Sequence, residues 1–199
     1  MSDELSGLPA YFTADEAAAV GLDEARLRSL IAAGELAKRE DLDHYHRTGH
    51  RESLWLHIHD ATAYVSGSVA CLGSALARHH LTDVIPKRVQ VAVPRGTVVE
   101  RLPWFPIEVI EFDARTFKVG WQMDEVNRGC DAPVYSRYRA LVDAIVRRDH
   151  ISEDIAREAV RRYKTNPANQ HELTKQELTE TAVMLGVERQ VAEFMESTT

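Results

Sequence analysis

The sequence lacks long hydrophobic runs and has little cysteine. No stretch of about 18 apolar residues occurs among its 199 residues, which argues against a membrane-spanning helix. The first residues, MSDELSGLPAYF, are acidic and show no basic segment followed by an apolar one, so no secretory signal is expected. Two cysteines, Cys71 and Cys130, provide neither a disulfide framework nor a CxxC metal pair. We therefore expect a protein of the reducing cytoplasm that has no membrane partner.

The motifs of several enzyme classes are also missing. The chain contains no GxSxG, no GxxxxGK[ST], no GxGxxG and no HExxH. The sequence therefore predicts no catalytic residue and no cofactor. The composition, with 44% hydrophobic and 28% charged residues, is that of a folded globular chain of one domain or two small ones.

The formal net charge of −7 is unevenly distributed along the chain. Residues 1–60 contain six basic and twelve acidic residues, a net of −6, whereas residues 61–131 contain eight of each. Residues 132–199 contain ten basic and eleven acidic residues, a net of −1. The acidity argues mildly against non-specific binding to nucleic acid, but it leaves room for local clusters of arginine.

Two short helices are predicted near the N-terminus. The segment from Thr13 to Glu16 is a capping box, which begins a helix that ends at Gly21. Asp23 caps a second helix, from Glu24 to about residue 33. Two helices joined by a three-residue turn are typical of a helix-turn-helix.

A helix-turn-helix presents polar side chains of its second helix to base edges, while nearby cations hold phosphates. The alternative is two short structural helices, which the acidity of this segment favours. The candidate DNA-contacting residues are Thr13, Glu24, Arg26, Arg28, Ser29, Lys38 and Arg39, with Lys87, Arg88 and Arg95 as secondary candidates.

A histidine-rich stretch spans residues 44–59. Residues 53–59 (SLWLHIH) alternate and predict a strand in the position of a wing, so that His57 and His59 would share one face. His44 and His46 have the same spacing. A hydrolytic zinc site needs three protein ligands, and HIHD is not the HxHxDH box of metallohydrolases. The sequence therefore favours a solvated, histidine-rich wing, and no metal ligand is predicted.

The remainder of the chain predicts an α+β fold. Strands are expected at 88–93 and 107–112, and residues 113–133 receive no assignment. Asp143 is expected to pair with a neighbouring arginine, and Cys71 to lie in the core. The predicted domains are 1–60, a reduced winged helix-turn-helix, and 61–199, a small sheet with packed helices and a helical C-terminus. Helices are expected at 75–81, 137–148, 153–164, 173–185 and 187–195.

The order of several segments resembles the AbiEi family of antitoxins from bacterial abortive-infection systems. The likeness covers most of the chain. It departs from the family in having only about ten residues before Tyr11, a histidine-rich stretch where the family's wing often reads GvYr, and no Thr after Arg139. The segments that carry the likeness are YFTADEAA through LRSLIAAGEL (residues 11–36), GSALARHHLTDVIP (73–86), VQVAVPRGT (89–97), VYSRYRALVD (134–143) and AVMLGV (182–187).

The resemblance implies an antitoxin that neutralises a nucleotidyltransferase-like toxin and represses its own operon by binding inverted repeats in promoter DNA. An acidic antitoxin would cover a basic, nucleic-acid-facing cleft of the toxin, and the middle and C-terminal arginines would contact phosphates of DNA. Two alternatives stay open. One is an enzyme that modifies the toxin or uses a metal on the histidine stretch. The other is a toxin-binding module that never contacts DNA.

Overall fold

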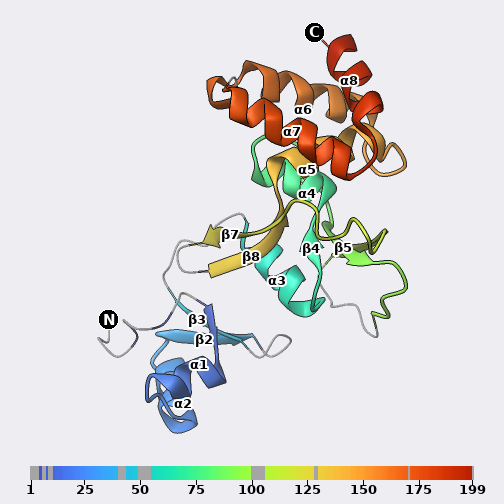
Figure 1. Cartoon of the computed structure of the whole chain (residues 1–199). Coiled ribbons are helices and arrows are strands. Elements are labelled where there is room, and N and C mark those ends of the chain that lie inside the picture. The colour runs from blue at the N-terminus through green and yellow to red at the C-terminus, as the bar shows by residue number, and fades with distance from the viewer. Residues whose placement is uncertain are drawn as a thin grey trace.

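The computed structural model shows an α+β protein (Figure 1). It describes residues 5, 8, 11–39, 44–48, 55–99, 106–127, 130–169 and 171–198. The buried apolar residues form two clusters, one drawn from residues 5–45 and a larger one from residues 56–191. No helix in the described ranges is both long and apolar enough to cross a membrane.

Two helices and a three-stranded antiparallel sheet make up the N-terminal part. Its elements are β1 (Tyr11–Thr13), α1 (Ala14–Ala19), α2 (Glu24–Ala32), β2 (Leu36–Arg39) and β3 (His44–Arg47). Strand β3 lies between the other two, in the order β1-β3-β2. Both predicted helices of this part are therefore confirmed. The strand pair that follows these helices is β2–β3, whereas the wing strand was expected at residues 53–59.

The core of this part is small. Phe12 of β1 and Tyr45 of β3 stack with their ring centroids 5.8 Å apart. Leu27 and Leu30 of α2 pack into the same cluster, and each contributes about 2 kcal/mol by burial. The apolar stripe predicted for the second helix is thus the face that fixes α2 on the sheet.

The larger part contains a five-stranded mixed sheet. Its strands lie in the order β6-β5-β4-β8-β7, with parallel β5–β6 and β4–β8 pairs and antiparallel β4–β5 and β7–β8 pairs. The elements are α3 (Leu56–Tyr64), β4 (Val69–Ala70), α4 (Leu72–Arg78), β5 (Val89–Pro94), β6 (Ile107–Phe112), β7 (Trp121–Asn127), β8 (Cys130–Tyr135), α5 (Arg137–Val146), α6 (Glu153–Thr165), η2 (Pro167–Asn169), α7 (Glu172–Met184) and α8 (Glu188–Ser197).

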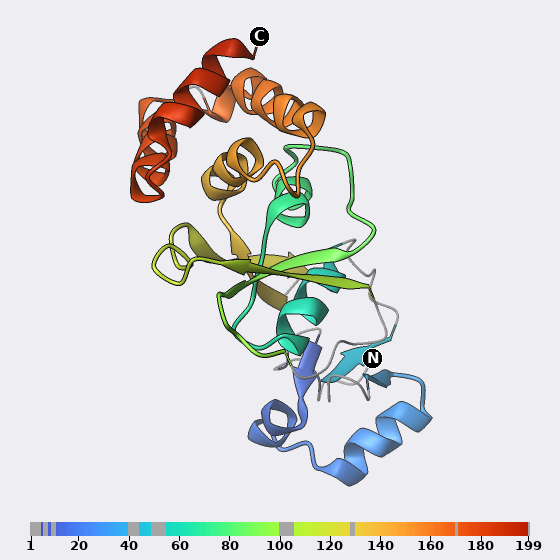
Figure 2. The same cartoon turned by 90° about the vertical axis from the view of Figure 1, so that its right-hand side faces the viewer.

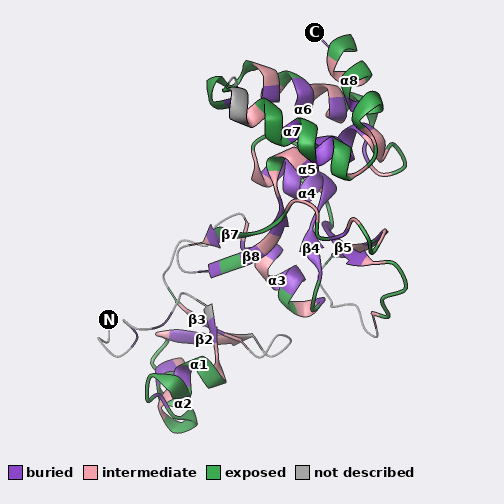
Figure 3. Ribbon diagram, viewed as in Figure 1, coloured by how far each residue is buried: buried purple, intermediate pink, exposed green. Residues whose placement is uncertain are grey.

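Helices cover both faces of this sheet. Figure 2 shows α3 on one side of the strands and α4 with α5 on the other, and α6, α7 and α8 form a further layer beyond α5. The burial colours of Figure 3 are deepest along α4, α5 and the central strands, where the two layers meet. As predicted, Cys71 is fully buried at the start of α4.

Three sequence predictions need correction. Residues 56–59 belong to α3 and not to a strand, because Ile58, Ala61 and Val65 are buried at helical spacing (residues 53 and 54 lie outside the described part). The helix expected at 75–81 begins earlier, at Leu72. Within 113–133, β7 and most of β8 were not predicted.

The other predicted elements of the larger part are confirmed within a few residues. They are the strands at 88–93 and 107–112 and the helices at 137–148, 153–164, 173–185 and 187–195. The domain boundary predicted after residue 60 falls inside α3, and buried residues of α3 belong to the larger cluster.

Candidate nucleic-acid interface

Helix α2 is held so that one of its faces points to solvent. The Asp23 carboxylate accepts a hydrogen bond from the Arg26 backbone N–H at 2.8 Å, which begins the helix. Leu27 and Leu30 anchor the opposite face in the core. The helix ends before Gly34, which has a φ of +71° and closes the turn into β2.

The solvent face of α2 combines polar and small residues. Glu24, Ala25, Arg28, Ser29 and Ala32 are all exposed and fall within one side of the helix at 100° per residue (Figure 3). The Arg28 Nε–H donates to the Glu24 carbonyl at 3.3 Å, which lays the side chain along this face. Because alanine side chains are short, the face allows a close approach of another surface.

Arg26 and Thr13 differ from the other predicted DNA-contacting residues. Arg26 lies on the flank of α2 and is only partly exposed. The Thr13 hydroxyl accepts from the Glu16 N–H at 3.2 Å, and the Thr13 N–H donates to the Glu16 carboxylate at 2.7 Å. This is the predicted capping box, so the Thr13 hydroxyl begins α1.

The strands beside α2 provide the cations near the expected wing. The Lys38 ammonium lies 5.6 Å from the centre of the Tyr45 ring. Arg39 is the last residue of β2, and in the antiparallel register its backbone lies opposite His44 of β3. Arg47, which was not among the predicted residues, donates from Nη2 to the Leu8 carbonyl at 2.8 Å. Lys38 and Arg39 are the predicted cations on the sheet that supports α2, and Thr13 of β1 belongs to the same sheet.

Most acidic residues of the described N-terminal part lie at helix starts. Asp15, Glu16, Asp23 and Glu24 all lie at the cap or in the first turn of α1 or α2, where the helix dipole favours negative charge. Over residues 11–39 and 44–48, five acidic residues are balanced by five basic ones. Much of the excess lies in residues outside the described part, including Glu40, Asp41 and Asp43 of the segment between β2 and β3.

The secondary candidates lie in the other sheet and are not brought together. Lys87 and Arg88 precede β5, and Arg95 follows it, so about 23 Å of extended chain separates Arg88 from Arg95. Arg95 borders a cavity of about 420 Å³, which is also lined by Glu111 and Asp113. The predicted residues are therefore distributed over three regions of the molecule. The largest group lies on α2 and β2.

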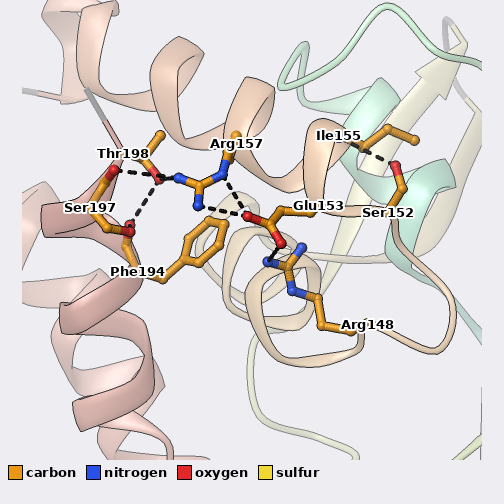
Figure 4. Close-up of polar contacts among 8 residues, drawn as sticks. All are labelled: Arg148, Ser152, Glu153, Ile155, Arg157, Phe194, Ser197 and Thr198. Atoms are coloured by element: carbon orange, nitrogen blue, oxygen red, sulfur yellow. Dashed lines mark hydrogen bonds and ion pairs between the residues drawn. The ribbon is translucent and has the colours of Figure 1, made fainter.

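Arg148, between α5 and α6, and Arg157 of α6 are engaged within the protein (Figure 4). The guanidinium carbons of Arg148 and Arg157 lie 4.6 and 5.1 Å from the centre of the Phe194 ring. Arg157 pairs with Glu153 at 2.6 Å and donates to the Thr198 hydroxyl at 3.2 Å. These cations anchor α8 on α6, so the expectation that they contact phosphates gains no support from their placement.

The histidines of residues 44–59 are divided between two elements. His44 and His46 share a face of β3, whereas His57 and His59 lie two positions apart on a helix and so point in different directions. The prediction that the latter pair shares a strand face is therefore wrong. The His44 and His59 rings meet edge to face at 5.6 Å. Among the described residues, no three histidine, cysteine or carboxylate side chains are grouped as metal ligands.

Residues of the segments that carry the AbiEi resemblance have structural roles. A Cβ atom at Gly73 would lie 2.8 Å from Pro86 Cγ, so this glycine permits close packing. The Ser74 hydroxyl accepts from the Gln90 N–H at 2.9 Å, which ties α4 to β5. In a later segment, Arg139 is buried and forms an ion pair with Asp143 one turn along α5.

No family model matches the sequence, and no curated protein matches it. The crystal structure of the RV2827C protein from Mycobacterium tuberculosis is similar to it in fold. The two share 14% sequence identity with a TM-score of 0.50, over 100% of this chain and 83% of that chain. At this level of identity the likeness concerns the fold, which is α+β.

Proposed function

We propose that this chain is an AbiEi-type antitoxin whose N-terminal part is a winged helix that binds promoter DNA. The observation that carries the DNA-binding part is the order of elements. Strand β1 is followed by the two helices, and β2 and β3 then form an antiparallel pair. Strand β3 is the central strand of the three-stranded sheet. This order supports the interpretation of the segment as a helix-turn-helix followed by a β-wing, with the second helix as the proposed reading helix.

The exposed face of α2 fits the major groove of DNA. Arg28 is the polar side chain nearest the middle of this face, Glu24 and Ser29 lie at its two rims, and arginine is the side chain that most often reads guanine. Ala25 and Ala32 leave room for the edges of the groove. Lys38 stands on the adjacent strand, where a cation meets the phosphate backbone.

The antitoxin part of the proposal rests on the ordered segments that resemble the family. Polar residues of these segments, such as Ser74 and Arg139, make contacts inside the larger part. The resemblance therefore supports a fold in common with the family more than a binding site in common with it. The net charge of −7 is compatible with a basic partner that handles nucleic acid. The partner we propose is the nucleotidyltransferase-like toxin encoded by the adjacent gene.

Two alternatives make different predictions. An enzyme on the histidine stretch requires bound metal, so stoichiometric zinc in the purified protein would favour it. A module that only binds the toxin would co-purify with it and would not retard promoter DNA. The His44 and His59 rings meet, but no third ligand is grouped with them among the described residues, so the metal alternative has no specific support.

Co-expression with the adjacent gene tests the proposed function. We expect the toxin alone to stop growth of the host and co-expression of this protein to restore it, with both proteins eluting together on size exclusion. The DNA-binding part is tested separately, by retardation of a duplex that carries the sequence upstream of the gene. Failure of rescue contradicts the antitoxin assignment, whatever the result with DNA.

A further inference from the structure

Glu24 places a negative charge on the solvent face of α2. It is the first residue of the helix, it is exposed, and it lies one turn before Arg28 on the same face. Its backbone carbonyl accepts from the Arg28 Nε–H at 3.3 Å, but its carboxylate has no hydrogen bond or ion pair with any described residue. The Glu24 carboxylate is therefore available to a group from outside the chain.

The start of α2 does not depend on the Glu24 side chain. The Asp23 carboxylate accepts from the Arg26 N–H at 2.8 Å and so caps the helix. Of the five exposed residues on the solvent face of α2, Glu24 alone is acidic. If this face meets DNA, the Glu24 carboxylate approaches a polyanion, and its contacts there decide whether binding is favoured or opposed.

The packing of α2 ties the position of Glu24 to that of Arg28. Leu27 and Leu30, on the opposite side, are 2% and 1% exposed in the core. The helix therefore cannot rotate to withdraw Glu24 while Arg28 enters a groove. The two positions differ by four residues, which is about 6 Å along the helix axis. This rise corresponds to about two base-pair steps of DNA.

The major groove offers few partners to a carboxylate. Of the groups that base pairs present there, only the N4 amino group of cytosine and the N6 amino group of adenine donate hydrogen bonds. In adenine the donor lies beside the N7 acceptor, which would repel the second carboxylate oxygen. Every other base edge offers an acceptor or a methyl group, so the carboxylate would lose water there without gaining a hydrogen bond. Cytosine is therefore the base that suits a carboxylate best.

We propose that Glu24 reads a cytosine in the major groove, about two base-pair steps from a guanine read by Arg28. This inference rests on the proposed function and names the bases that the solvent face of α2 selects. The Glu24 carboxylate accepts from the cytosine N4 amino group. It also makes every site without that cytosine less favourable, so it adds specificity and lowers the affinity for other sequences.

A panel of duplexes tests the base assignment. Each base pair of the upstream duplex is replaced in turn by the other three, and binding of the full-length protein is measured by fluorescence anisotropy. We expect the wild type to lose at least about fivefold in affinity when the cytosine is replaced. E24A should bind all four duplexes equally at that position and keep its preferences elsewhere. E24Q should prefer adenine there, because a glutamine amide pairs with adenine N6 and N7.

D15A is the matched control. Asp15 is an exposed acidic residue in the first turn of α1, and its carboxylate also has no hydrogen bond or ion pair with a described residue. The substitution removes the same charge from the same part of the molecule. We expect D15A to keep the base preference of the wild type at every position, because a change in charge alone acts on all sequences alike.

Urea unfolding establishes that each variant is folded, and E24Q retains the size of the side chain. The inference is overturned if no position of the duplex requires cytosine in the wild type, if the cytosine preference survives in E24A, or if D15A loses it equally. Each of these results leaves DNA binding by α2 intact. If the wild type binds the upstream duplex no more tightly than unrelated DNA, the DNA-binding part of the proposed function fails first.

Discussion

Arg139 and Asp143 form an ion pair inside the protein, one turn apart on α5. The Arg139 Nε and the Asp143 Oδ2 are 2.8 Å apart, and the two side chains are only 2% and 4% exposed. Arg139 also donates from Nη1 to the carbonyls of Thr116 and Val119, at 2.8 and 2.9 Å. The pair therefore joins α5 to the loop that leads into β7.

Removing one partner of this pair should destabilise the fold strongly. In D143A the Arg139 guanidinium stays buried without its carboxylate, which costs about 3–5 kcal/mol. The matched control is E193A, since Glu193 pairs with Arg189 at the same spacing and distance on exposed α8. There we expect a loss of at most about 0.5 kcal/mol. Urea unfolding measures both, and equal losses would contradict the structural role of the buried pair.

Gly120 should tolerate alanine less well than Gly67. Both have positive φ, +72° and +76°, so alanine is strained at either position. A Cβ atom at Gly120 would also lie 2.6 Å from the Arg139 Cβ, whereas at Gly67 no atom lies within 4 Å. We expect G120A to be less stable than G67A by about 1–3 kcal/mol in urea unfolding, the cost of overpacking. Similar losses would contradict the close approach of this loop to α5.

The stability of the protein should depend on pH through His79. Burial lowers the pKa of this histidine, although its ring donates to the Tyr135 carbonyl at 2.7 Å. The unfolded chain then binds more protons, so the free energy of unfolding falls as the pH is lowered through about 6.5. Burial raises the pKa of Asp143 to about 6, which acts in the opposite direction.

A comparison of the wild type with H79Q isolates the histidine, because Asp143 is present in both. Between pH 7.5 and pH 5.5 we expect the wild type to lose more stability than H79Q. H171Q changes an exposed histidine and serves as the control. Identical pH dependence in the wild type and H79Q would show that His79 is not buried in the way the structure describes.

The sequence predicted the N-terminal helices because their signals are local. Thr13 and Asp23 cap the helices, and Leu27 with Leu30 marks the buried side. It also predicted that Asp143 pairs with an arginine, since position 139 lies one turn away. The exposed face of α2 follows from the same periodicity, and three of its five residues were predicted to contact DNA.

The errors arose where local patterns conflict with tertiary packing. Residues 53–59 alternate like a strand, yet residues 56–59 lie in α3, which is buried on several sides, and this burial hides the helical period. Strand β7 was missed because its edge position leaves Trp121 and Met123 exposed and removes the alternation. Lys87 and Arg95 were grouped by sequence, although β5 places them at opposite ends.

Salt-dependent binding to DNA tests the central claim most directly. Fluorescence anisotropy would compare the wild type, R28A and R189A on a duplex from upstream of the gene, at several salt concentrations. Arg189 is the matched control, an exposed arginine on α8. We predict affinity that falls as salt rises, a loss of about 1–3 kcal/mol in R28A, and wild-type binding by R189A. Equal binding by R28A and the wild type, or affinity that does not change with salt, would contradict DNA reading by α2.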